Sequence, residues 1–288
     1  MTAIYKKELK SYLTSMIGYL FMAFTLALFG LYFTAINLQQ GYPEIGYALQ
    51  NSAFILLIAV PVLTMRVLSE EQKNKTDQLL LTAPVKISDI ILGKYLALLT
   101  IYVIPVLIMC LYPLLLGTHG TVSYAVSYTS ILGYFLLGAA YISVGVFVSS
   151  ITESQGVAAG LCFVVLLVCY FLPDLSDYFS TSAFASFAAF TVVVLLIGLI
   201  FRLMTRNTPV SVTLMVVLEV PLILGYGLGG DSFAGLFPSL VEELSLFEKF
   251  YQFVDGIFDV RCLVYFLTVI LVFLFLTVQF LEKRRWSE

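Results

Sequence analysis

The densest group of side chains that could do chemistry lies in one polar stretch between two apolar runs. Residues 70–94 read EEQKNKTDQLLLTAPVKISDIILGK and hold four acidic and four basic side chains. Such a mixture can form ion pairs and hydrogen bonds with a partner. It contains no nucleophile beside a base and no residues spaced as metal ligands, so we expect neither hydrolytic catalysis nor a metal site.

Two polar residues lie apart from this stretch. His119 is the single histidine and has no cysteine nearby in the sequence, so a catalytic or metal-binding role is not expected. Glu219 lies within the apolar run VTLMVVLEVPLILG, where an ionisable side chain is costly and indicates a polar pathway or a buried partner. A protonated or interhelically hydrogen-bonded glutamate with a structural task is the alternative.

Neither a bound nucleotide nor a disulfide framework is expected of this chain. The sequence has no GxxxxGK[ST] motif, the loop that cradles ATP phosphates in many ATPases. The four cysteines lie in or beside apolar runs without CxxC spacing, so we expect them to act as small hydrophobic residues.

Composition predicts the elements that must position these side chains. Of the 288 residues 60% are hydrophobic and 11% charged, whereas soluble domains are about 25% charged. Apolar runs of about 20 residues, the length of a membrane-spanning helix, recur along the chain. We therefore predict an all-α integral membrane protein with about eight transmembrane helices. The predicted spans are residues 17–36, 54–68, 95–116, 128–149, 156–172, 184–201, 210–228 and 262–281.

Basic residues predict the orientation of these spans. With the N-terminus in the cytoplasm, all Lys and Arg except Lys249 and Arg261 fall on the inner side. The sequence thus predicts a multi-pass protein of the cell membrane with both termini cytoplasmic. Residues 1–288 are expected to form one transmembrane domain, with the 70–94 stretch inside the cell.

Two amphipathic segments are expected beside the spans. Residues 2–15 are predicted to form an interfacial helix. Its apolar face carries Tyr5, Leu9, Tyr12 and Met16, and its basic face carries Lys6, Lys7 and Lys10. Residues 229–261 are predicted to form an external loop with an amphipathic helix over residues 242–259, lying on the outer surface. The apolar positions of that helix are Leu244, Phe247, Tyr251, Val254 and Phe258.

The polar stretch itself is predicted to form a cytoplasmic helix-turn-helix over residues 70–93. Residues 69–82 can continue the second span as a helix, but Pro84 cannot continue it, so the chain must turn. Ser88 and Asp89 suit the first turn of a helix that runs into the third span. The apolar tip at Leu79, Leu80 and Leu81 is either part of a solvated connector or, with its charged rim, a docking surface for a partner.

This stretch resembles the EE-x-x-x-GT-x-E-LLLT-x-P-V-x-x-x-x-I-V-L-GK pattern of ABC-2 type transporter permeases, in particular the branch near the gliding-motility permeases. Further segments of the resemblance are KKELKSY and IGYLF near the start, SSITESQGVA at residues 149–158 and FVDGIFDVRCLVYF at residues 253–266. Two departures occur. Lys75 stands where the family usually has Gly, and residues 77–78 replace the usual apolar–Glu pair. Spans six and seven look additional to a six-span core.

The resemblance implies the transmembrane subunit of an ATP-driven transporter, an exporter formed by two permease chains, which is not itself an enzyme. ATP and Mg would bind to separate ABC ATPase subunits. Membrane lipid is a further expected partner, whereas nucleic acid is not. Residues 70–84 would form the coupling helix that presses on the ATPase, and the turn at residues 152–155 a second contact. The candidate coupling residues are Glu70, Glu71, Lys73, Thr76, Leu79, Leu80, Leu81, Pro84, Glu153 and Gln155.

Small residues predict where helices pack closely. Gly156 and Gly160 form a GxxxG motif at the start of the fifth span, and Gly138 and Gly145 give the fourth span small faces. We expect helix packing at these positions, either within the chain or at the seam between two chains.

Two other functions stay open at this point. One is a secondary transporter or channel that uses Glu219 as a proton-linked site and needs no ATPase. The other is a membrane scaffold whose cytoplasmic loop only recruits a partner. The ABC transporter alone requires that an ATPase bind at residues 70–84 and that changes there uncouple ATP hydrolysis from transport.

Overall fold

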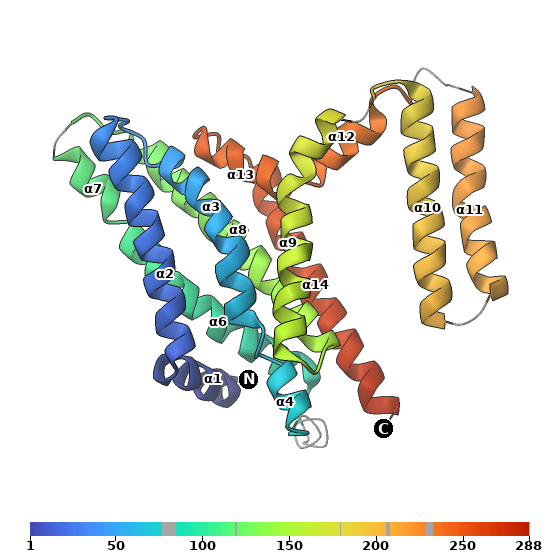
Figure 1. The fold of residues 1–288 in the computed structure, drawn as a ribbon, viewed down its shortest axis with the longest axis horizontal. Helices are drawn as coiled ribbons and strands as arrows, with labels where there is room; N and C mark the ends of the chain where they lie inside the picture. Colours follow the sequence, from blue (N-terminus) through green and yellow to red (C-terminus); the bar gives the residue numbers. More distant parts are fainter. Residues whose placement is uncertain (77–84, 119, 179, 206–207, 229–232, 288) are drawn as a thin grey trace. The chain divides into compact units, whose positions relative to one another are not determined.

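The described part of the chain is built from helices. A computed structural model describes residues 1–76, 85–118, 120–178, 180–205, 208–228 and 233–287 (Figure 1). Within these ranges no β-strand occurs, which confirms the predicted all-α fold. The helices are α1 (Thr2–Thr14), α2 (Met16–Phe33), the π-helical η1 (Thr34–Gln39), α3 (Gly46–Thr64), α4 (Ser69–Lys73), α6 (Ile87–Met109), α7 (Tyr112–Gly117), α8 (Tyr124–Ile151), α9 (Gln155–Tyr178), α10 (Ala183–Thr205), α11 (Thr208–Leu228), α12 (Leu236–Glu243), α13 (Leu246–Val254) and α14 (Val260–Ser287).

Six helical segments among the described residues are long and apolar enough to cross a membrane. They are Met16–Gln39, Gly46–Lys73, Ile87–Gly117, Tyr124–Ile151, Gln155–Leu172 and Val260–Arg285. Each matches one of the eight predicted spans. The other two predicted spans coincide with α10 and α11, whose described apolar stretches, Ala183–Leu195 and Met215–Gly227, are shorter. The chain is therefore a multi-pass membrane protein.

Contacts between residues divide the chain into two units. The core unit comprises Met1–Tyr170 and Lys249–Glu288, and the hairpin unit comprises Phe171–Glu248. In the hairpin unit α10 and α11 pack against each other. That unit holds the two helices that look additional to a six-span core in the sequence. One domain over residues 1–288 stays a prediction.

The core unit is organised around α8, which packs on α14, α3 and α6. A side chain at Gly138 would overlap the ring of Tyr102, and one at Gly145 would overlap Thr64. The Tyr102 hydroxyl donates to the Tyr134 carbonyl at 2.7 Å, which fixes α6 against α8. The predicted close packing along the fourth span is thereby confirmed at Gly138 and Gly145.

The predicted helix over residues 242–259 is wrong in its extent, and its predicted apolar face is confirmed only at Phe247 and Val254, which are buried. α12 ends at Glu243 and α13 at Val254, and Gly256 follows with a φ of +77°, a conformation that ends the helical path. Phe258 is exposed, whereas Phe250 and Phe253 are buried. Phe253 lies against Gly133 of α8, and its carbonyl accepts from Ser130 at 3.2 Å. Packing on α8, rather than contact with an outer surface, selects the buried face.

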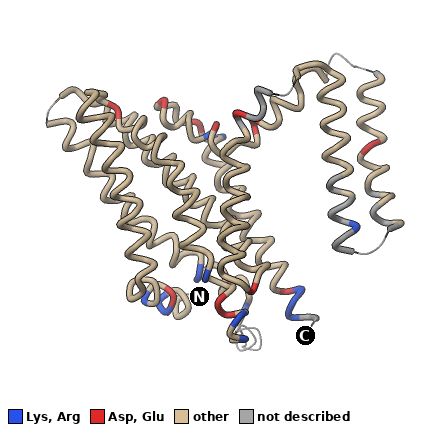
Figure 2. The backbone as a smooth tube through the Cα atoms, in the orientation of Figure 1, with Lys and Arg blue, Asp and Glu red and all other residues tan. Residues whose placement is uncertain are grey.

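Most basic residues of the core unit gather at one end of it. Figure 2 shows them at the end that holds α1, α4 and both termini. Lys249 in α13 and Arg261 in α14 belong to segments away from this end. We call this region the α1–α4 end; it also includes the α8–α9 turn at residues 152–154.

Candidate functional site

The polar stretch begins at a break in the second span. α3 ends at Thr64, residues 65–68 form a turn, and α4 covers Ser69–Lys73. The first N–H groups of a helix lack partners within it. Here the N–H groups of Leu68 and Ser69 donate to the Ser149 hydroxyl of α8 at 3.1 and 3.3 Å. The break is therefore capped by the end of another span.

The predicted continuous helix over residues 69–82 is wrong in its described part, because α4 ends after five residues. The Thr76 N–H donates to the Glu71 carbonyl at 3.0 Å, and the Lys75 N–H to the Gln72 carbonyl at 3.1 Å. This is the Schellman pattern of a helix end. Lys75 has a φ of +55°, in the left-handed region. Gly, which the resembled family pattern has at this position, would adopt this conformation without strain.

Lys75→Gly is expected to stabilise the end of α4 by up to about 1 kcal/mol, because it removes the strain of a left-handed Cβ-bearing residue. Denaturant titration of the purified protein in detergent micelles measures the change. Lys73→Gly, within α4, is the control and should destabilise, because Gly disfavours helix interiors. A destabilised Lys75→Gly variant would contradict the left-handed assignment.

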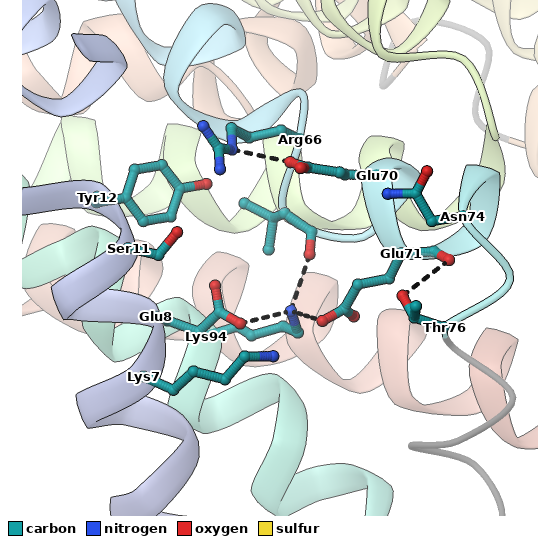
Figure 3. Close-up of a pocket in the computed structure, with 11 residues that line it drawn as sticks. Lys7, Glu8, Ser11, Tyr12, Arg66, Glu70, Glu71, Asn74, Thr76 and Lys94 are labelled. Atoms are coloured by element: carbon teal, nitrogen blue, oxygen red, sulfur yellow. Dashed lines mark hydrogen bonds and ion pairs between the residues drawn. The ribbon is translucent and has the colours of Figure 1, made fainter. Parts of the chain in front are cut away.

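Lys94, in the second turn of α6, is the centre of the site. Its side chain is 2% exposed, and its ammonium group lies 2.9 Å from Glu71 Oε1 and 3.1 Å from Glu8 Oε1 (Figure 3). It also donates to the Val67 carbonyl at 3.0 Å. All three ammonium protons therefore have acceptors. We call Lys94, Glu8, Glu71 and the Val67 carbonyl the Lys94 cluster; it joins α6, α1, α4 and the turn after α3.

Beside the cluster, α1 is docked on the core by its tyrosines. The buried Tyr12 hydroxyl donates to the Leu63 carbonyl at 3.2 Å, and burial raises the pKa of Tyr12, so the donor proton is kept. Arg66 lies over the Tyr12 ring at 5.5 Å and pairs with Glu70 at 3.0 Å. Tyr5 shares a hydrogen bond of 3.0 Å with Thr100 of α6. The predicted apolar face of α1 is confirmed at Tyr12, but it packs on protein.

The two predicted coupling segments are joined where α4 meets the end of α8. Gln72 of α4 donates from its side-chain amide to the Ser150 carbonyl at 2.8 Å. Glu153 follows in the α8–α9 turn, largely exposed, with Arg284 of α14 at 3.6 Å. Gln155 is the first residue of α9. The remaining predicted coupling residues, Leu79, Leu80, Leu81 and Pro84, lie outside the described residues.

A polar cavity of about 280 Å³ opens between α1 and α4 (Figure 3). Its lining side chains include three carboxylates and three cations, so their charges cancel. The lining residues are Lys7, Glu8, Ser11, Tyr12, Arg66, Val67, Glu70, Glu71, Asn74, Thr76 and Lys94. Within the described ranges no group of three or more His, Cys, Asp or Glu is placed to hold a metal ion. The chemistry available here is ionic contact and hydrogen bonding, which suits mechanical attachment.

The other singled-out residues lie elsewhere. Glu219 of α11 accepts a 2.8 Å hydrogen bond from the Thr191 hydroxyl of α10, within the hairpin unit. This is the interhelical contact of the structural alternative; a role in a pathway stays a prediction. No atom of the described chain lies within 4 Å of a side chain added at Gly156 or Gly160. Close packing at these two glycines is therefore not found within the chain.

Comparison with known families decides the class of protein. The sequence matches the model described as ABC-2 family transporter protein over residues 2–284, which includes the hairpin unit. The chain belongs to the ABC-2 transporter family. It is thus a membrane permease subunit of an ABC transporter, a class of subunit that works with ABC ATPases. No curated protein matches the sequence.

Sequence reasoning missed the residues that hold the permease's α1–α4 end together. Glu8 and Lys94 were not among the predicted site residues, nor were Gln72 and Ser149. One signal for Glu8 was present. Glu8 lies four residues after Ile4 and four residues before Tyr12. This spacing places its carboxylate on the packed face of α1. A buried charge of this kind requires a partner.

Proposed function

We propose that this permease is the transmembrane subunit of an ATP-driven exporter, in which two permease chains form the substrate pathway and two ATPase subunits drive it. Membership of the ABC-2 family is the observation that carries this proposal. The sequence lacks the ATP-binding GxxxxGK[ST] motif. ATP and Mg therefore bind to the ATPase subunits. Residues 70–84 and 152–155 are the surfaces that receive the ATPase.

The contacts of α4 support this role. A push on α4 reaches α1 and α6 through the Lys94 cluster and reaches α8 through Gln72 and Ser149. These elements then move together at the α1–α4 end. Pro61 within α3 and Pro105 within α6 remove backbone hydrogen bonds, so bending concentrates there. ATPase closure would in this way alter the spans without breaking the cluster.

Orientation follows from the same end. The α1–α4 end holds most basic residues of the core unit, together with both termini. Basic residues favour the cytoplasmic side of a membrane. This distribution supports our placing of the α1–α4 end in the cytoplasm, where the ATPase and its nucleotide are found.

Replacing Leu79, Leu80 and Leu81 together by serine tests the proposal. An apolar tip with a charged rim loses its central contact, so we expect the ATPase subunit to bind less and its permease-stimulated ATP hydrolysis to fall at least tenfold. The measurements are co-purification in mild detergent and ATPase assays of the reconstituted complex. The matched control is Leu38→Ser with Leu114→Ser, two exposed leucines of η1 and α7 at the opposite end of the core unit.

Two outcomes would overturn the proposal. One is that no ATPase subunit co-purifies with the wild-type chain. The other is that substrate movement continues in its absence, as a secondary transporter using Glu219 would allow. A scaffold would bind the ATPase without changing its rate of hydrolysis.

Pairing of two permease chains has its own test on α9. At Gly156 and Gly160, α9 has a face without side chains, which another helix can approach closely. The exposed Val157 and Val164 lie next to this face. Gly160→Leu is expected to convert paired permease chains into single chains, measured by the mass of the detergent-solubilised complex. A Cβ atom added at Gly30 in α2 also meets no atom within 4 Å, so Gly30→Leu is the control. If Gly160→Leu leaves the pair intact, the seam does not lie on this face.

A further inference from the structure

We infer that the outer face of α1 is a binding surface for anionic phospholipid headgroups. Two lysines form this surface, Lys6 and Lys10. They lie on the side of α1 turned away from Tyr12, which packs on the core. Lys7 instead lines the polar cavity between α1 and α4 (Figure 3). Lys6 and Lys10 would recognise the negative charge of the lipid phosphate, which lies at the boundary of the membrane.

The charge on this face is uncompensated. Glu8 is the acidic residue of α1, and it is turned inward, where it pairs with the buried Lys94. Lys6 and Lys10 are both exposed. Among the ion pairs of the described residues, none involves these two lysines. The inward turn of Glu8 thus leaves a purely cationic surface on the outside of the helix.

The position of α1 places this surface at the level of lipid headgroups. Ser15, with a ψ of 150°, interrupts the helix, so that α1 lies across the beginning of α2 (Figure 1). The first turn of that span exposes Met16, Tyr19 and Leu20, which are 80%, 57% and 51% exposed. Large apolar side chains exposed on a span are solvated by lipid, and Tyr is typical of the membrane interface. The lysines therefore lie where hydrocarbon gives way to phosphate.

The helix is held firmly enough to keep this geometry. Tyr5 is bonded to Thr100, Tyr12 to Leu63, and a side chain at Gly93 of α6 would meet Met1 and Ile4 at 3.2 and 3.3 Å. α1 therefore lies directly on α6 and has little freedom to turn. Its basic face stays outward, and its inner face stays on the Lys94 cluster. Bound anionic lipid would fix the same helix that holds α4.

Competition between two lipids tests the inference. The purified permease is incorporated into nanodiscs with mixtures of phosphatidylglycerol and phosphatidylcholine, and the lipids retained on the protein after extraction are counted by native mass spectrometry. Each basic residue near an anionic surface contributes about a fivefold preference. Replacing Lys6 and Lys10 by glutamine is expected to reduce the preference for phosphatidylglycerol by at least about tenfold.

Two control variants separate position and charge from folding. Lys86 and Lys283 are exposed lysines of the α1–α4 end, and their joint replacement by glutamine removes the same charge elsewhere. This variant should keep the preference. Replacing Lys6 and Lys10 by arginine keeps the positive charge and should also keep the preference for phosphatidylglycerol. Equal loss in both glutamine variants overturns the inference, because the effect is then one of net charge. A second outcome also overturns the inference: the α1 glutamine variant keeps its preference for phosphatidylglycerol but no longer binds the ATPase. The α1 surface would then bind an acidic protein rather than lipid.

Discussion

Replacing Lys94 by methionine is expected to lower the free energy of unfolding of the permease by about 3–5 kcal/mol. The substitution removes the one cation between Glu8 and Glu71, whose carboxylates are only 12% and 16% exposed. Both charges and the Val67 carbonyl then lack their partner in a poorly solvated place. Denaturant titration of the purified permease in detergent micelles measures this loss.

Two further variants show whether charge is the cause. Lys86→Met, at an exposed position one residue before α6, should leave the free energy of unfolding nearly unchanged. Adding Glu8→Gln and Glu71→Gln to Lys94→Met removes the stranded carboxylates and should recover at least half of the lost stability. That triple variant then tests coupling, since its permease-stimulated ATP hydrolysis should fall although the fold is restored. Wild-type stability of Lys94→Met would contradict the buried cluster.

Gly138→Ala is expected to destabilise the core unit by about 1–3 kcal/mol, because the interior of a protein tolerates extra volume poorly. The added methyl group would overlap the ring of Tyr102, which is fully buried and is held by its hydrogen bond to the Tyr134 carbonyl. The rings of Phe21 and Phe135 also lie against it, with centroids 6.3 and 6.0 Å away, so a shift of the Tyr102 ring would displace its neighbours. The same titration in micelles reports the effect.

We attribute the expected destabilisation to steric overlap with Tyr102 rather than to a change in backbone conformation. A second substitution tests this explanation. Tyr102→Leu alone should lower the free energy of unfolding. The double variant with Gly138→Ala should lose less stability than the sum of the losses of the two single variants. Gly30→Ala in α2 is the matched control, since nothing lies within 4 Å of the new methyl group, and it should be neutral or slightly stabilising. Strict additivity of Gly138→Ala and Tyr102→Leu would contradict the packing model.

The spans could be predicted because lipid imposes a simple rule on sequence. A helix that crosses a bilayer must be apolar over about 20 residues. Each of the six membrane-spanning segments accordingly matches a predicted one, and Gly138 and Gly145 were identified from their small size within an apolar helix. The helix beginning near Ser88 and Asp89 was also predicted, and α6 begins at Ile87. These features depend on neighbours within one or two turns.

The Lys94 cluster could not be predicted because its members are distant in the sequence. Lys94 is 86 residues from Glu8 and 23 from Glu71. The beginning of α4 depends on Ser149, 80 residues from Ser69. For α13, the predicted positions Phe247 and Val254 are buried, but Phe253, which lies against Gly133 of α8, was not among the predicted positions. In each case the tertiary partner, which no local pattern contains, decides the outcome.

The distance between Glu8 and Lys94 also sets an order for biogenesis. Glu8 leaves the ribosome early, whereas its cation follows 86 residues later, after the first two spans have been made. Until then α1 has no partner for its inward carboxylate and cannot dock on α6. Closure of the cluster therefore marks the moment when the third span has entered beside the first two. An assembly that stalls before this point would present an undocked N-terminal helix to the quality-control proteases of the membrane.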